Sequence, residues 1–278
     1  MSLEHKGSLE KELIIFDLDG TLAASKSALD SEMAGLIIKL LEGRKVAVIS
    51  GGKYAQFEKQ FLGNLPKDEL SAKYFQNLFL LPTSGTRLYS WKMIGEREGE
   101  RENSGGKKVG AVGVWYEEYS ENLSEDDKKT ILKTLKEALL EAGIETPEKT
   151  YGQIIEDRES QITFSALGQE APLELKNAWD PNGAKRKVAV DILKERLPNF
   201  DVSMGGSTSI DITMKGVNKA YGIHKLEEFL KIPIIKMVFV GDKIFPGGND
   251  YAAKMTGVDC IQVSGPEETK KIIEKLIN

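Results

Sequence analysis

The stretch Ile14-Ile15-Phe16-Asp17-Leu18-Asp19-Gly20-Thr21-Leu22 decides the fold, because an apolar run ends there in two aspartates two positions apart. Side chains alternate along a strand, so both carboxylates should leave on the same side. At about 5 Å and an effective dielectric of about 20, two such charges repel by roughly 3 kcal/mol. Some other interaction must offset this repulsion at the end of a core strand. On this stretch alone, a plain Asp-Gly turn remains an alternative to a functional site.

The residues around this stretch alternate short apolar runs with amphipathic segments. We expect buried strands at 13–16, 45–50, 77–82, 236–242 and 259–263, and helices at 31–43, 53–62, 218–230 and 265–277. Continuous Val- and Ile-rich strands that alternate with helices indicate a parallel sheet covered on both faces. The predicted fold class is therefore α/β, with a Rossmann-like core.

The middle of the chain has a different pattern. Segments 86–93 and 160–167 alternate apolar with polar residues, as half-exposed antiparallel strands do. A long helix is expected at 124–143, capped by Ser124, and 95–108 is a polar, Gly-rich loop. We predict a core of 1–86 and 215–278 interrupted by an inserted α+β domain at 87–214, with Trp91, Trp115 and Trp179 packing the insertion.

Composition excludes several classes of protein. The 278 residues carry a net charge of −5, which argues against a nucleic-acid or anionic membrane partner. No apolar run approaches the ~18 residues that cross a bilayer, and the polar start of the chain lacks the apolar core of a signal peptide. The one cysteine, Cys260, is expected in a buried strand rather than in a disulfide. A cytoplasmic enzyme or binding protein fits these observations.

Polar signals follow the ends of the core strands, where ligands gather in open α/β sheets. They are the pair Asp17 and Asp19, the run Ser50-Gly51-Gly52, Lys219 at the start of a helix, Gly241-Asp242, and Asn249-Asp250. Carboxylates at one site suit Mg²⁺, which takes a few protein oxygens plus water and substrate phosphate. Free amides can bind phosphate oxygens, and a lysine can neutralise charge during phosphoryl transfer. Taken singly, the Ser-Gly-Gly run could be a plain turn and the lysine an ordinary solvated residue.

In order and spacing these signals resemble the haloacid dehalogenase-like (HAD) superfamily. Its DxDGT signature stands here as Asp17-Leu18-Asp19-Gly20-Thr21, followed by the hydroxyl, lysine and acidic motifs in the required order. The insertion lies between the second and third motifs, as in members with the larger (type C2) cap. Within the superfamily the chain looks like the eukaryotic-type phosphomannomutases over nearly its whole length. The segments that carry this likeness are 49–64, 203–212 and, most sharply, "GDKIFPGGND" at 241–250.

The resemblance implies roles for particular residues. Asp17 would attack phosphorus and carry an aspartyl-phosphate. Ser50 and the Gly51 amide would bind phosphate oxygens, and Lys219 would neutralise charge during the transfer. Asp19 would exchange the proton with the leaving and accepting oxygens, while its backbone carbonyl helps bind Mg²⁺. The implied metal site comprises Asp17, Asp19, Asp242, Asn249 and Asp250. In the cap, Arg158 would contact a second phosphate, and Ser209 and Asp211 the sugar. All three could instead be ordinary polar surface residues.

Three departures from the family bear on the reaction. Gln169 and Lys176 stand where the mutases carry two further cap arginines, and Lys26 replaces an arginine soon after the first motif. A mutase must retain a bisphosphorylated intermediate while it turns over, and planar arginines suit that task better than Gln or Lys. Both lysines could also be plain surface residues.

We therefore expect a Mg²⁺-dependent phosphatase acting on a phosphorylated sugar or similar metabolite. A phosphohexomutase that interconverts hexose 6-phosphate and 1-phosphate is the alternative, and a non-catalytic phosphosugar-binding protein is the second alternative. The resemblance also implies a homodimer formed through the cap.

Overall fold

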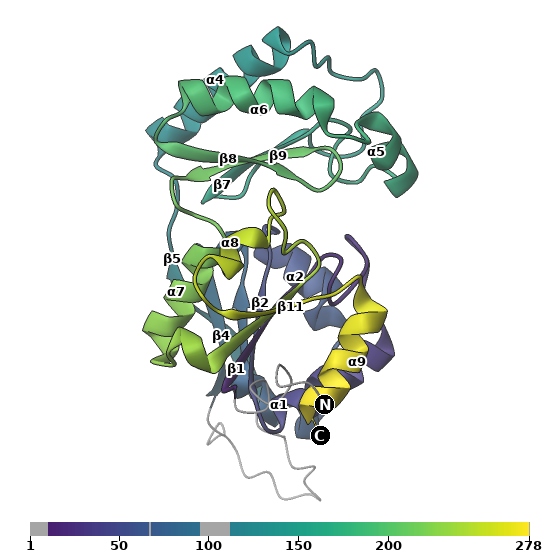
Figure 1. Cartoon of the computed structure of the whole chain (residues 1–278), viewed down its shortest axis with the longest axis vertical. Helices are drawn as coiled ribbons and strands as arrows, with labels where there is room; N and C mark the ends of the chain where they lie inside the picture. Colours follow the sequence, from purple (N-terminus) through teal and green to yellow (C-terminus); the bar gives the residue numbers. More distant parts are fainter. Residues whose placement is uncertain (1–10, 67, 95–111, 278) are drawn as a thin grey trace, which may run out of the picture. The chain divides into compact units, whose positions relative to one another are not determined.

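The computed structural model describes residues 11–66, 68–94 and 112–277, which form two compact units. The first comprises Met1–Ser120 and Asn218–Asn278, and the second comprises Glu121–Val217. The predicted α/β fold class is confirmed: a mostly parallel sheet forms the first unit and a separate antiparallel sheet the second (Figure 1). Calls on the N-terminal tail and on the loop at 95–108 lie outside the described residues.

The core sheet has the strand order β11-β10-β1-β2-β3-β4-β5. Its parallel strands are β11 (Asp259–Gln262), β10 (Met237–Gly241), β1 (Leu13–Asp17), β2 (Lys45–Ile49) and β3 (Leu78–Leu81). In β1 every residue is buried, with Ile14 and Phe16 in one apolar cluster and Leu13 and Ile15 in the other. The sheet is therefore covered on both faces, as its apolar strands predict.

Helices cover the two faces of this sheet (Figure 1). The helices α1 (Ser31–Leu41), α2 (Tyr54–Gln60) and α9 (Pro266–Ile277) contribute to the cluster that contains Phe16. The helices α7 (Lys219–Leu230) and α8 (Tyr251–Lys254) contribute to the other cluster. A short α3 (Glu69–Ala72) precedes β3. Side-chain caps fix two of the helix starts: Asp30 accepts from the Met33 N–H at 2.8 Å, and Asn218 accepts from Ala220 at 2.9 Å.

The predicted start of the insertion, at residue 87, is wrong. The strands β4 (Arg87–Ile94) and β5 (Val112–Ser120) extend the core sheet, with Phe79 of β3 paired antiparallel to Ser90. Alternation correctly indicates antiparallel strands, but the pattern does not say which sheet they join. The placement of two tryptophans is wrong for the same reason: Trp91 and Trp115 pack against the core residue Phe75.

The second unit is an α+β layer. Its sheet has the order β6-β7-β9-β8, made of β6 (Ile155–Asp157), β7 (Gln161–Ser165), β9 (Ser209–Met214) and β8 (Phe200–Gly205). The helices are α4 (Glu125–Glu141), α5 (Leu173–Trp179) and α6 (Ala184–Arg196). Inward residues such as Ile162 and Ile212 pack with Ile131 of α4 and Leu193 of α6. Trp179 is part of this cluster, as predicted.

Two further findings concern the exposure of Cys260 and the composition of the helices. Cys260 is half-buried rather than buried, because β11 is the edge strand of the core sheet. Among the helices of the described ranges, none combines the length and the apolar composition needed to span a bilayer.

Candidate active site

The ends of three neighbouring strands bring the core signals together. Asp17 is the last residue of β1, Ser50 directly follows β2, and Asp242 directly follows β10. Because β1 pairs in parallel with both β2 and β10, these residues lie at one edge of the sheet. This is the edge at which ligands bind in open α/β sheets.

Three carboxylates and one lysine form a buried cluster at this edge. Oxygens of Asp17, Asp242 and Asp250 lie within 4.8 Å of one another. The Lys219 ammonium forms ion pairs with both Asp17 and Asp250, and the three side chains are almost completely buried. Asp250 also accepts from the Lys243 N–H at 3.0 Å. Lys219, in the first turn of α7, thus pairs one positive charge with two of the three acids.

Burial and mutual repulsion shift the ionisation of this cluster. Burial raises the pKa of Asp17 to about 7, with Lys219 opposing the shift and Asp250 and Asp242 adding to it. Burial likewise raises the pKa of Asp242, against the nearby Lys243. Burial alone would lower the pKa of Lys219, but the carboxylates of Asp17 and Asp250 outweigh it, so this pKa is above its usual value. The lysine is therefore charged at neutral pH.

A divalent cation fits these residues. Asp242 Oδ1 is buried and has no hydrogen-bond donor among the described residues. This oxygen can therefore coordinate a cation. Gly20 keeps the space beside the Asp242 carboxylate open, because a Cβ at this position would lie 2.5 Å from Asp242 Oδ2. Carboxylate oxygens converging on one point are the donor set of Mg²⁺.

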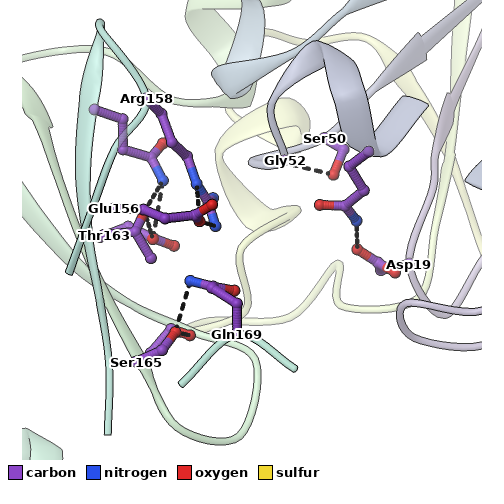
Figure 2. Close-up of polar contacts among 12 residues, drawn as sticks. Asp19, Ser50, Gly52, Glu156, Arg158, Thr163, Ser165 and Gln169 are labelled. Atoms are coloured by element: carbon purple, nitrogen blue, oxygen red, sulfur yellow. Dashed lines mark hydrogen bonds and ion pairs between the residues drawn. The ribbon is translucent and has the colours of Figure 1, made fainter. Parts of the chain in front are cut away.

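The Ser50-Gly51-Gly52 loop is held by the turn that follows β3. The Ser84 N–H donates to the Ser50 carbonyl at 2.9 Å, and the Thr83 N–H donates to the Gly52 carbonyl at 2.9 Å. Thr83 and Ser84 both have positive φ, 47° and 58°, which is strained for residues with a side chain. Ser50 Oγ accepts from the Gly52 N–H at 3.2 Å (Figure 2). The two backbone hydrogen bonds hold the loop in place beside the acid cluster despite this strain.

The Asp19 side chain faces α2, where two residues missed by the sequence analysis bind it. Gln56 Nε2 donates to Asp19 Oδ2 at 3.0 Å, and Gln60 Nε2 donates to Asp19 Oδ1 at 3.0 Å. The Lys26 N–H also donates to Oδ1, at 2.6 Å. The i, i+4 spacing of the two glutamines on a short helix is the signal that could have found them.

Within the second unit, the polar face of the sheet carries the predicted cap residues. The Arg158 guanidinium donates twice to Glu156 Oε2, at 3.0 and 2.8 Å (Figure 2). Asp211 Oδ1 accepts from Gln161 at 2.9 Å and from Thr163 at 2.8 Å. These contacts fix the charged groups of the face in place.

Three further hydrogen bonds in this unit involve the predicted residues Ser209, Gln169 and Lys176. The Ser209 hydroxyl bonds that of Ser165 at 2.8 Å, and Gln169 Nε2 donates to the same Ser165 hydroxyl at 2.8 Å. Lys176 Nζ donates to the Gln169 carbonyl at 2.8 Å. Gln161, Thr163 and Ser165 were missed, although their alternation along one strand places them on one face.

The remaining predicted residues, Lys26, Gly51 and Asn249, differ in exposure and contacts. Lys26 is exposed and has a positive φ of 55°, and its backbone N–H donates to Asp19 Oδ1. Gly51 is half-buried, and Asn249 is exposed in the turn before Asp250. Their roles toward substrate or metal remain predictions.

Residues 106–278 match the sequence model of a family described as eukaryotic phosphomannomutase. The chain belongs to this family. It is 27% identical to a phosphomannomutase of Spinacia oleracea over 93% of each chain. It is 25% identical to a phosphomannomutase of Saccharomyces cerevisiae over 96% of this chain and 94% of the relative.

Two solved structures of phosphate-ester hydrolases share this fold. An IMP-nucleotidase of Plasmodium falciparum superposes with a TM-score of 0.65 at 18% identity, over 99% of this chain and 71% of that chain. A trehalose-6-phosphate phosphatase of Aspergillus fumigatus gives a TM-score of 0.53 at 17% identity, over 100% and 98%. Such likeness shows the fold alone. The chain is thus an enzyme of the HAD superfamily, a phosphomutase or a phosphatase, and its relatives favour the mutase alternative over the phosphatase that the cap substitutions favour.

Proposed function

We propose that this enzyme moves the phosphoryl group of a phosphorylated sugar through an aspartyl-phosphate on Asp17, and that its main reaction is hexose-phosphate interconversion. The buried cluster of Asp17, Asp242, Asp250 and Lys219 carries the proposal, because it combines a nucleophile, a cation and a divalent-metal donor set at one point. Relatives named phosphomannomutase, aligned over more than nine-tenths of the chain, support the sugar phosphate as substrate.

Asp17, Asp242 and Asp250 would bind Mg²⁺, with the Asp19 carbonyl and Asn249 as the further ligands that the resemblance implies. The ion supplies positive charge to the transferring phosphoryl group. Lys219, which forms ion pairs with Asp17 and Asp250, would add a second positive charge. Ser50 and the amides of its loop bind phosphate oxygens.

Each half-reaction moves one proton through Asp19. In the first, an Asp17 oxygen bonds to phosphorus as the bond from phosphorus to the sugar oxygen breaks, and protonated Asp19 donates its proton to that oxygen. In the second, the Asp19 carboxylate takes the proton of an incoming hydroxyl, which attacks phosphorus as the bond to Asp17 breaks. The incoming hydroxyl is a sugar hydroxyl in a mutase and water in a phosphatase.

Hydrolysis is the second candidate, and the cap residues favour it. Gln169 supplies no charge, and Lys176 is engaged by the Gln169 carbonyl. The Arg158 guanidinium is paired with Glu156. Weak binding of the sugar's second phosphate by these residues would give water more time to reach the aspartyl-phosphate before a sugar hydroxyl does.

One assay separates the two reactions. The enzyme receives mannose 1-phosphate, Mg²⁺ and a catalytic amount of a sugar bisphosphate, and both the 6-phosphate and free phosphate are measured. We expect interconversion to exceed phosphate release. Phosphate release without interconversion would instead establish a phosphatase. Asp17→Asn should abolish both products while the protein stays folded, and full activity in that variant would exclude Asp17 as the nucleophile.

A further inference from the structure

We propose that Gln56 and Gln60 are positioning residues, which set the carboxylate of Asp19 in the orientation needed for proton transfer. The inference deepens the proposed function and rests on it, since Asp19 transfers a proton only if Asp17 accepts a phosphoryl group. The sequence analysis gives neither glutamine a role, although both lie in the segment 49–64 that resembles the phosphomannomutases.

The two amides and the carboxylate form a closed ring of hydrogen bonds. Gln56 Nε2 donates to Asp19 Oδ2 at 3.0 Å and to Gln60 Oε1 at 2.9 Å. Gln60 Nε2 closes the ring by donating to Asp19 Oδ1 at 3.0 Å. Each carboxylate oxygen therefore accepts from one glutamine, and Oδ1 also accepts from the Lys26 N–H. The ring fixes the rotation of the carboxylate plane (Figure 2 shows Asp19 with one of these bonds).

Both glutamines are themselves fixed. Gln60 is 3% exposed, and its backbone carbonyl accepts from the Leu29 N–H at 2.8 Å. The Gln56 amide lies over Gly52, where an added Cβ would be 2.2 Å from Gln56 Oε1. The ring thus contacts the phosphate-binding loop as well as the acid.

The ring contributes to stability as well as to orientation. Loss of one amide leaves an Asp19 oxygen without that donor, which lowers the stability of the fold where the oxygen stays buried. In addition, a carboxylate held at a set angle spends more of its time aligned with the oxygen that gains or loses the proton. The ring therefore serves the reaction of Asp19.

The test compares two substrates whose leaving groups differ in whether they must be protonated. A sugar alkoxide must be protonated as it leaves, whereas p-nitrophenolate leaves without a proton. We compare Gln56→Leu and Gln60→Leu with wild type, with Asp19→Asn as reference and Glu58→Gln as control. Glu58 is exposed on the same helix. The readouts are turnover of mannose 1-phosphate and the pre-steady-state burst of p-nitrophenolate from p-nitrophenyl phosphate, both with Mg²⁺.

We expect Gln56→Leu and Gln60→Leu to lose about 10- to 100-fold in sugar-phosphate turnover, part of the contribution of a general acid–base group. Their p-nitrophenolate burst rate should stay within about 2-fold of wild type, as for Asp19→Asn, because that step needs no proton. Glu58→Gln should match wild type in both. Gln56 is only half-buried, so its variant remains informative if replacement of the buried Gln60 unfolds the protein.

Equal losses on both substrates would overturn the inference, because they would place the effect on Asp17 or on the fold. Wild-type turnover of both substrates in the two variants would overturn it as well. If wild-type protein gives neither a burst nor turnover, the proposed function fails and the inference with it, so the two failures are distinguishable.

Discussion

Replacement of Lys219 by methionine should destabilise the metal-free core strongly. Its ammonium is 3% exposed and lies between the side chains of Asp17 and Asp250, which are 3% and 0% exposed. Methionine keeps most of the length of the apolar stem but removes the charge. The variant then holds two buried carboxylates with no cation between them.

The magnitude follows from this burial. Removing one partner of a buried ion pair costs about 3–5 kcal/mol, because the remaining charge stays desolvated. At about 2–4 °C for each kcal/mol in a unit of this size, the melting temperature should fall by roughly 6–20 °C. The double variant Lys219→Met/Asp250→Asn should regain much of the loss, since one of the two stranded charges is gone.

The assay is urea and thermal unfolding in EDTA, followed by tryptophan fluorescence. Trp91 and Trp115 lie in the same unit as the cluster and report its unfolding. Lys225→Met is the control: it removes a half-buried lysine charge of the same helix, one that lies over the Tyr119 and Tyr221 rings, and leaves Lys219 between its two carboxylates. A loss under about 1 kcal/mol in Lys219→Met, or no recovery in the double variant, would refute the view that this lysine neutralises a buried acid pair.

Three further predictions address other parts of the core. Burial raises the folded-state pKa of Asp17 from 3.8 to about 7. In EDTA, the stability of wild type relative to Asp17→Asn should therefore be greatest below pH 3.8 and fall as the pH rises toward 7. A difference that grows with pH in urea titrations would contradict this. Gly20→Ala would place a Cβ 2.5 Å from Asp242 Oδ2, at a φ of +86°. Calorimetry should show Mg²⁺ affinity reduced about 10- to 100-fold, and unchanged affinity would show that the space beside Asp242 is unimportant. Burial raises the pKa of Cys260 to about 11. At pH 8 its alkylation should be about 200-fold slower than that of a free cysteine, whereas labelling at the free rate would show an exposed thiolate.

The sequence was sufficient for the core because local pattern and catalytic chemistry agree there. Val- and Ile-rich strands can only be buried on both faces, and motif order then brings Asp17, Ser50 and Asp242 to one edge. The same reasoning predicted the carboxylates that we propose as metal ligands. Lys219 could be placed near them because it opens the helix that follows the insertion.

Features set by tertiary contacts could not be predicted in the same way. The alternation in β4 marks a half-exposed strand but does not identify its partner, so residue 87 was taken as a domain boundary. The edge position of β11, and with it the partial exposure of Cys260, is a property of the whole sheet. The ring around Asp19 joins residues 37 and 41 positions away from it, and only the folded chain shows that contact.

The most direct test of the central claim is to trap the phosphoryl-enzyme. Protein turning over mannose 1-phosphate with Mg²⁺ is quenched in acid, reduced with borohydride to convert an aspartyl-phosphate to homoserine, digested with trypsin and sequenced by mass spectrometry. The account predicts conversion at Asp17 within the peptide that spans residues 12–26. Conversion at Asp19 instead, or rapid turnover with no converted aspartate, would contradict it.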